Sequence, residues 1–286
     1  MQHCCDGGYA LGYFESWNLE SLQGTLDAAE QTRSPIIVGF NGDFLSRDGR
    51  RCRERLPLYG GLAKAAAQSA NVPCGLIFNE CPNDEWNLQA IDAGFNLIVP
   101  VEPTAPYDDY VRRLRRIVPL AHARHAAVEA ELGELPCGAS GLSSGHASLT
   151  DPAVAGEFVK ATDVDLLAVS IGNVHIQLRG EQDLDLDRLE QIHKRVAVPL
   201  VLHGGTGISA GSLKAAIGLG VAKVNYGTYL KQRYLGAMQV ALARCPDNPH
   251  EALGMGGEAD IMVAGREAVR DAVLERISLL GCCGKA

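Results

Sequence analysis

Short apolar runs alternate with longer amphipathic segments along the whole chain. Eight runs have the length and flanking turn residues typical of buried parallel strands, and they span residues 9–14, 35–40, 74–78, 96–101, 126–132, 166–171, 199–203 and 221–226. Segments with apolar residues at helical spacing lie between them, for example at 19–29, 86–93, 110–121 and 209–218. Repeated strand–helix units without an internal linker predict an α/β protein: a single (β/α)8 TIM barrel over residues 1–286 rather than a doubly wound sheet.

One irregular stretch, residues 134–150, interrupts this alternation. It is rich in glycine and serine, and it is longer than most connections in a compact domain. Loops of this length are usually functional. We therefore expect this segment to be an active-site lid.

Polar residues gather at the carboxyl ends of the predicted strands, whereas the strand interiors are apolar. TIM barrels carry their chemistry at that end because the loops that follow the strands meet there. The side chains that the predicted boundaries place there are Glu15, Asn41, Asn79, Glu80, Glu102, Glu131, His175, His203 and Asn225. Their coincidence at one end predicts an active site more strongly than any single motif does.

Two histidines lie at the ends of neighbouring predicted strands. The segment Ile-Gly-Asn-Val-His ends in His175, and the turn His-Gly-Gly-Thr-Gly begins with His203. Imidazoles on adjacent strand ends can share a metal ion. The alternative is that each histidine caps its strand through backbone hydrogen bonds, without a metal.

Glycine-rich turns follow the last two predicted strands, which is where TIM barrels often bind phosphate. The first turn contains Gly204, Gly205 and Thr206, and the second runs from Asn225 to Thr228. Glycine lets backbone amides approach an anion, and helix N-termini add their dipoles. The turns predict a phosphorylated small-molecule substrate, although ordinary tight strand–helix turns would have similar sequences.

Charge and composition narrow the choice of partners. The net charge of −8 argues against nucleic-acid binding, and no apolar run reaches the roughly 18 residues that span a bilayer. The first residues lack the charged and apolar regions of a signal peptide. Nine cysteines without a secretion signal are typical of free thiols in a reducing compartment, so we expect a cytoplasmic protein without catalytic cysteines.

Taken together, these motifs resemble the class II (metal-dependent) ketose-bisphosphate aldolases, which include the fructose- and tagatose-bisphosphate enzymes. The resemblance covers nearly the whole chain. Its segments are 18–20, 34–38, 90–95, 128–133, 150–152, 171–175, 203–207, 221–225 and the C-terminal 280–286.

The resemblance implies a site and a reaction. The family acts on a dihydroxyacetone phosphate unit, and its metal, mostly zinc, stabilises the enediolate that forms when the carbon–carbon bond breaks. It also implies a homodimer or homotetramer. The implied roles are metal ligation by His175 and His203, a position near the metal for Glu131, phosphate contacts for Gly204, Thr206 and Thr228, and a substrate contact for Asn225.

The sequence departs from the family pattern at several functional positions. An Asp-His pair follows the third strand in the family, where the aspartate handles the proton of the substrate hydroxyl and the histidine is the third metal ligand; this chain has Asn79 and Glu80. The family's aspartate after strand eight is Gly227, and an asparagine after strand one is Glu15. The acidic residue of the family's lid is missing from 136–139, and the glycine after the first metal histidine is Ile176.

Glu80 and Asn79 change the expected chemistry. Glutamate is a competent ligand, so Glu80 with the two histidines would suit zinc but also manganese, iron or cobalt. The alternative is that Glu80 has left the metal. Because the Asn79 amide is not basic, another group must accept the proton, and the candidates are Glu15, Glu80 and His146.

These observations predict a divalent-metal-dependent, aldolase-like lyase with an altered substrate. It would cleave or form a carbon–carbon bond next to a metal-bound carbonyl. Two alternatives remain open: a metal-dependent sugar-phosphate isomerase or epimerase that uses the same enediolate, and a homologue that binds ligands without catalysis.

Overall fold

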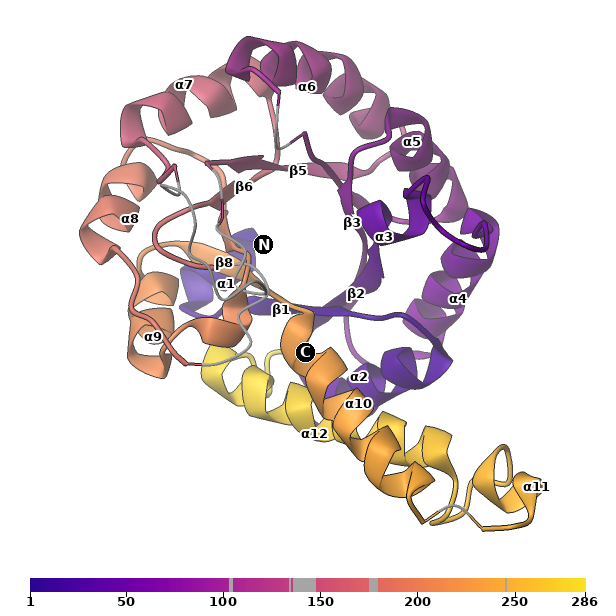
Figure 1. Cartoon of the computed structure of the whole chain (residues 1–286). Coiled ribbons are helices and arrows are strands. Elements are labelled where there is room, and N and C mark those ends of the chain that lie inside the picture. The colour runs from indigo at the N-terminus through magenta and orange to yellow at the C-terminus, as the bar shows by residue number, and fades with distance from the viewer. Residues whose placement is uncertain (103–104, 134, 136–147, 175–179, 245) are drawn as a thin grey trace.

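Eight parallel strands form a closed barrel in the computed structural model of this chain (Figure 1). The structure describes residues 1–102, 105–133, 135, 148–174, 180–244 and 246–286. The strands pair in chain order, and β8 pairs with β1 to close the barrel. Their bounds are β1 Leu11–Glu15, β2 Ile36–Asn41, β3 Cys74–Cys81, β4 Leu97–Pro100, β5 Ala127–Leu132, β6 Leu166–Val169, β7 Leu200–Leu202 and β8 Val221–Tyr226. The predicted TIM barrel is confirmed.

Helices surround the barrel, as Figure 1 shows. They are α1 Gln2–Gly7, α2 Leu19–Thr32, α3 Gly42–Ser46, α4 Leu56–Ser69, α5 Asp84–Ala93, α6 Tyr107–His122, α7 Pro152–Thr162, α8 Leu186–His193, the short 3-10 helix η2 Gly205–Gly207, α9 Ala210–Gly218, α10 Thr228–Leu242, α11 Pro249–Ala252 and α12 Ile261–Leu280. Side-chain caps fix several helix starts. Asn18 forms a capping box with Ser21 at α2, and Asp151 accepts two backbone amides ahead of the N-terminal proline of α7.

The strands bury both faces, one against the barrel interior and one against the helices. β2 and β8 are buried at every residue, as expected for parallel strands covered on both sides. Side chains at alternating strand positions form the inner cluster, which contains Tyr13, Ile37, Ile77, Leu97, Val99, Val101, Leu166, Ala168 and Val201. Glycine is required at Gly39, because a Cβ there would lie 1.8 Å from the Ile77 carbonyl oxygen on β3. The alternation therefore decides which residues can reach the mouth of the barrel.

The C-terminal helices form an arm beyond the barrel wall. α10 and α12 pack against each other, and their outer ends project away from the barrel with α11 at the tip (Figure 1). Asp260 begins α12: its carboxylate accepts the amides of Gly254, Gly256 and Met262 at 2.8, 2.9 and 3.0 Å. The inner part of α12 packs along α2.

Strand and helix boundaries differ from the sequence-based ones by a few residues. The most informative difference is at β3, which continues through Asn79 and Glu80 to Cys81 instead of ending at Phe78. Most of the predicted lid, residues 134 and 136–147, lies outside the described residues, and so do His146 and His175. Among the described helices, none is long and apolar enough to cross a membrane.

Candidate active site

A cavity of about 570 Å³ lies at the carboxyl ends of the barrel strands. We call it the mouth cavity. Its lining includes most of the side chains that the sequence predicted for the site: Glu15, Asn79, Glu80, His203, Gly204, Thr206, Asn225 and Thr228. Glu131 and Glu102 line a neighbouring cavity of about 430 Å³ on the β4–β5 side. Most of the side chains predicted at the strand ends therefore lie together in the mouth cavity.

His203 lies at the centre of this group, one residue after β7, and it is 1% exposed. Its Nε2 is 2.8 Å from Glu129 Oε1, while its Nδ1 is 3.2 Å from Glu80 Oε1 and 3.7 Å from Glu131 Oε2. Burial alone favours the neutral ring, but hydrogen bonds with Glu129 and Glu80 and the charge of Glu131 raise the pKa of His203 to about 10. The same negative field that favours the imidazolium would attract a metal cation.

A buried ion pair between Glu129 and Lys223 holds the Nε2 side of the His203 ring in place. Lys223 Nζ donates to Glu129 Oε2 at 2.8 Å, and neither side chain is exposed. Burial disfavours the carboxylate, yet the Lys223 charge and the hydrogen bonds from His203 and Lys223 hold the pKa of Glu129 below its usual value. Burial lowers the pKa of Lys223, and the charge of Glu129 opposes that shift. The pair fixes the carboxylate that orients the imidazole.

Glu80 reaches the mouth because of a bulge. In a regular strand it would face the helices, since Asn79 before it faces the interior. Its φ is +54°, and the pairing of β3 with β4 shifts register between Phe78 and Cys81. Asn41 then donates from Nδ2 to Glu80 Oε2 at 2.9 Å, while its Oδ1 accepts the amide of Phe44. The bulge thus puts two successive side chains of β3 into one cavity.

The residues that line the mouth cavity include buried polar atoms with no hydrogen-bond partner among the described residues. Besides the Tyr226 hydroxyl, which packs in the helix-side core, they include the Tyr13 hydroxyl on β1, Asn79 Oδ1 on β3 and Asn225 Nδ2 on β8. Asn225 is oriented by Lys223, whose Nζ donates to its Oδ1 at 2.7 Å. A buried polar group left unpaired costs about 1–3 kcal/mol, so native proteins rarely keep one without a reason. These atoms offer one acceptor, one donor and one hydroxyl to a bound molecule.

Glu15 takes the space above Gly227. Its Oε1 accepts a hydrogen bond from Lys231, and a Cβ on Gly227 would lie 2.2 Å from its Oε2. Burial raises the pKa of the Glu15 carboxyl, while the charge of Lys231 opposes that rise. A side chain at 227 and the present position of Glu15 therefore exclude each other.

The turns after β7 and β8 fit an anion. Gly204 has a φ of +67°, which glycine adopts without strain, and η2 follows it directly. Gly227 and Thr228 begin α10 at the mouth cavity, so the positive end of its dipole points there. Gly205 has another role: a Cβ there would lie 2.6 Å from Val224 Cγ1, so this glycine serves close packing on β8.

The donor set suits a divalent cation. Within the described ranges, no three His, Cys, Asp or Glu side chains are arranged as a metal cluster, and His175 falls outside them. Glu80 and Glu131 nevertheless approach the Nδ1 of His203, and Glu129 holds the opposite nitrogen. A histidine that ligates a metal through one ring nitrogen usually donates its other ring N–H to a carboxylate or a similar acceptor. The residues present therefore fit the predicted metal.

Sequence reasoning missed four residues of this site. Glu129 and Lys223 look like isolated charges in apolar strands, and only their pairing explains them. Tyr13 could have been found from its position two residues before Glu15, which places both side chains on the interior face. Asn173 fixes the backbone of His203, because its Nδ2 donates to the His203 carbonyl at 3.0 Å.

Sequence comparison assigns the chain to a family. The model of the family described as "Fructose-bisphosphate aldolase class-II" matches residues 1–285. The chain belongs to the class II fructose-bisphosphate aldolase family. This class II aldolase homologue is 32% identical to the fructose-bisphosphate aldolase of Geobacillus stearothermophilus over 284 residues, which covers 98% of this chain and 94% of that protein.

Two further comparisons agree with this assignment. The sulfofructosephosphate aldolase of Alkalicoccus urumqiensis is 30% identical over 288 residues, covering 100% of this chain and 96% of that protein. The crystal structure of the YdjI aldolase from Escherichia coli K12 superposes with a TM-score of 0.80 at 31% identity, and the match covers 100% of this chain and 96% of that chain. Four positions at which the sequence is expected to depart from the family pattern line the mouth cavity: Glu15, Asn79, Glu80 and Gly227.

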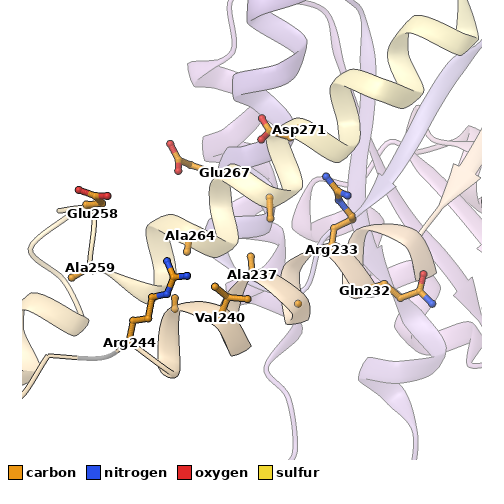
Figure 2. A pocket seen from close by; sticks show the side chains of 13 residues that line it. Gln232, Arg233, Ala237, Val240, Arg244, Glu258, Ala259, Ala264, Glu267 and Asp271 are labelled. Carbon is orange, nitrogen blue, oxygen red and sulfur yellow. The ribbon is translucent and has the colours of Figure 1, made fainter.

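A larger cavity lies outside the barrel. It measures about 800 Å³ and runs between α10 and α12, as Figure 2 shows. We call it the arm groove. Alanines and side chains such as Arg244, Glu267 and Asp271 line it, and it contains none of the predicted site residues.

Proposed function

We propose that this protein is a divalent-metal-dependent, aldolase-like lyase that cleaves or forms a carbon–carbon bond beside the carbonyl of a phosphorylated ketose. One observation carries the proposal: a histidine flanked by carboxylates, unpaired buried polar atoms and glycine-rich turns all line a single cavity. The two curated relatives described above are named for phosphorylated ketoses, which supports a substrate of that class.

The phosphate end of the substrate would lie at the turns after β7 and β8. Gly204, Thr206 and Thr228 offer donors there, with the N-terminus of α10 behind them. The carbonyl end would then extend toward His203 and the unpaired amide of Asn225. This placement brings the bond to be cleaved near Asn79 and Glu15.

His203 and Glu80 would hold the metal, with His175 as the predicted third ligand. A bound zinc, manganese, iron or cobalt ion would polarise the ketone and stabilise the negative charge that develops on its oxygen. Glu129 keeps the imidazole of His203 oriented, and the Lys223 charge keeps Glu129 ionised. Glu131 adds a further carboxylate near the same ring nitrogen.

Glu15 is our choice for the proton acceptor. Asn79 can hold the substrate hydroxyl through its Oδ1 but cannot take its proton. The Glu15 carboxylate lies in the same cavity, and burial raises its pKa above that of an exposed carboxyl, which makes it a stronger base. In the cleavage direction Glu15 Oε2 would accept the hydroxyl proton, the carbon–carbon bond would break, and its electron pair would move toward the ketone carbonyl.

Exchange of the hydroxymethyl proton of dihydroxyacetone phosphate tests this function. NMR in D₂O with added metal should show stereospecific exchange that stops with chelator and returns when zinc or manganese is restored. His203→Ala should slow exchange by about a thousandfold or more, as expected when a metal ligand is lost. His193→Ala, an exposed histidine on α8, should leave the rate unchanged. Exchange that survives both chelation and His203→Ala would contradict the proposal, and isomeric sugar phosphates without an aldehyde product would favour an isomerase.

We also infer that the protein is a homodimer or homotetramer. The arm exposes large apolar side chains along α10 and beyond it, with Leu235, Val240 and Met255 at 58%, 56% and 67% exposure. Apolar surface of this kind on a projecting element is typical of subunit contacts. A mass equal to one chain by light scattering would contradict this inference.

A further inference from the structure

A second, smaller cavity adjoins the mouth on the β1–β2 side. It measures about 210 Å³ and shares Glu15, Asn41, Phe44 and Lys231 with the lining of the mouth cavity. We call it the side cavity. Its remaining lining comes from the segment after β1, from β2, from α3 and α4 and from the segment between these two helices, at Ser16, Trp17, Phe40, Leu45, Arg50 and Tyr59. Two cavities with a shared wall at the strand ends can hold two parts of one molecule.

We propose that the side cavity binds the far end of the aldehyde half of the substrate, and that this end is an uncharged, polyhydroxylated chain. The reaction in which the chain takes part rests on the function proposed above. The binding preference rests on the side cavity alone.

The first argument is charge balance. Lys231 pairs with Glu15. Arg50 donates from Nη1 to the Phe44 carbonyl at 2.7 Å, from Nε to the Cys52 carbonyl at 3.3 Å and from Nη2 to Glu54. Both cations in the described lining therefore already have partners. A phosphate, sulfonate or carboxylate would bring further negative charge next to Glu15 without an uncommitted cation to receive it. A hydroxyl can accept from one member of a charged pair and donate to the other.

The second argument is an unpaired hydroxyl. Ser16 is 2% exposed, and its Oγ has no hydrogen-bond partner among the described residues. Its backbone amide donates to the Gly39 carbonyl at 2.8 Å, so the residue is fixed at the end of β1. A ligand hydroxyl would satisfy this group at no electrostatic cost.

The third argument is the aromatic lining. Trp17, Phe40 and Tyr59 line the side cavity, and the rings of Phe40 and Tyr59 pack edge to face with centroids 4.9 Å apart. Tyr59 donates its hydroxyl to Glu54 at 2.8 Å, which holds its ring in place. Rigid aromatic faces pack well against the C–H groups of a hydroxylated carbon chain, while the few polar groups between them set its orientation.

Phe44 and Lys231 separate the two cavities. The Lys231 ammonium lies 4.6 Å from the centroid of the Phe44 ring, and Phe44 is 41% exposed. The position of Lys231 is thus fixed by a carboxylate and by an aromatic face. The length of chain that passes this wall would decide which aldehydes are accepted.

Aldehydes of increasing length test the proposal. Condensation with dihydroxyacetone phosphate would be measured for glycolaldehyde, D-glyceraldehyde, D-erythrose and D-glyceraldehyde 3-phosphate. We expect kcat/KM to rise with the number of hydroxylated carbons, and the phosphorylated aldehyde to be poorer than its neutral counterpart. Ser16→Ala should lower kcat/KM for erythrose by about fivefold, the effect of one hydrogen bond, without changing it for glycolaldehyde. Ser69→Ala, an exposed serine at the end of α4, is the matched control.

Direct binding separates this proposal from the proposed reaction. Erythritol and inorganic phosphate would be titrated against the full chain and Ser16→Ala by ligand-observed NMR, which requires no turnover. Erythritol binding that weakens in Ser16→Ala supports the subsite even if no dihydroxyacetone phosphate exchange is found. Three results would each overturn the subsite. They are a higher kcat/KM for the phosphorylated aldehyde than for its neutral counterpart, a kcat/KM that does not change with chain length, and erythritol binding that is absent or unchanged in Ser16→Ala. Thermal unfolding of both serine variants controls for the fold.

Discussion

The mouth cavity and the arm groove differ in size and in chemistry, and the smaller one is the better candidate site. The arm groove measures about 800 Å³ and the mouth cavity about 570 Å³. Buried polar atoms of Tyr13, Asn79 and Asn225 line the mouth without partners among the described residues, whereas none of the unpaired buried atoms belongs to the groove lining. Unsatisfied buried groups indicate a missing ligand more directly than volume does.

The charges of the two regions differ in the same way. In the arm, Arg233 lies 3.7 Å from Glu275, with about half of each side chain exposed, so water screens the pair. In the barrel, Glu129 and Lys223 are fully buried and depend on each other and on His203. Substitutions in the barrel should therefore have larger effects than those in the arm.

The largest expected effect is on stability, from Lys223→Met. This change leaves the Glu129 charge buried without its cation, so the free energy of unfolding should fall by about 3–5 kcal/mol. Lys194→Met removes the exposed pair with Glu190 and should cost less than about 1 kcal/mol. Urea unfolding measures both. Equal losses of unfolding free energy in the two variants would show that the buried pair stabilises the fold no more than the exposed pair does.

Two glycines of one chain segment give an intermediate effect. Gly227→Ala brings a Cβ against Glu15 Oε2 at 2.2 Å and should displace that carboxylate, so kcat/KM should fall about tenfold. Gly236→Ala, which lines the arm groove on α10 with nothing within 4 Å of the new Cβ, should raise the free energy of unfolding by about 0.5–1 kcal/mol and leave activity unchanged. Steady-state kinetics and urea unfolding measure the pair. Full activity of Gly227→Ala would mean that the position of Glu15 is unimportant.

The smallest effect is expected at the tip of the arm. Asp260→Ala removes the carboxylate that caps α12, which should cost about 1 kcal/mol of stability with activity within a factor of two. Asp260→Asn keeps one acceptor oxygen and should lose less. A calorimetric melting temperature and the condensation rate measure the two properties. A large loss of activity in Asp260→Ala would show that the arm and the mouth are coupled and do not act independently.

The sequence predicted the strand ends of the site better than its interior. His203, Asn79, Glu80 and Asn225 were found because each follows or ends an apolar run, and the barrel fold brings such ends together. Lys223 was missed because its partner Glu129 is 94 positions away, and no local pattern records that contact. The proposed ligand role of His175 stays a prediction, since that residue lies outside the described part of the chain.

The sequence by itself determined the closed barrel and the end at which its chemistry lies, because alternating strands and helices allow few other arrangements. The tertiary structure decided which atoms face one another there. Three features depend on strands that meet at a particular register. They are the bulge that turns Glu80 toward His203, the position of the Glu15 carboxylate above Gly227, and the unpaired Ser16 hydroxyl in the side cavity. Periodicity assigns a residue to a face, but only packing in three dimensions determines its neighbours.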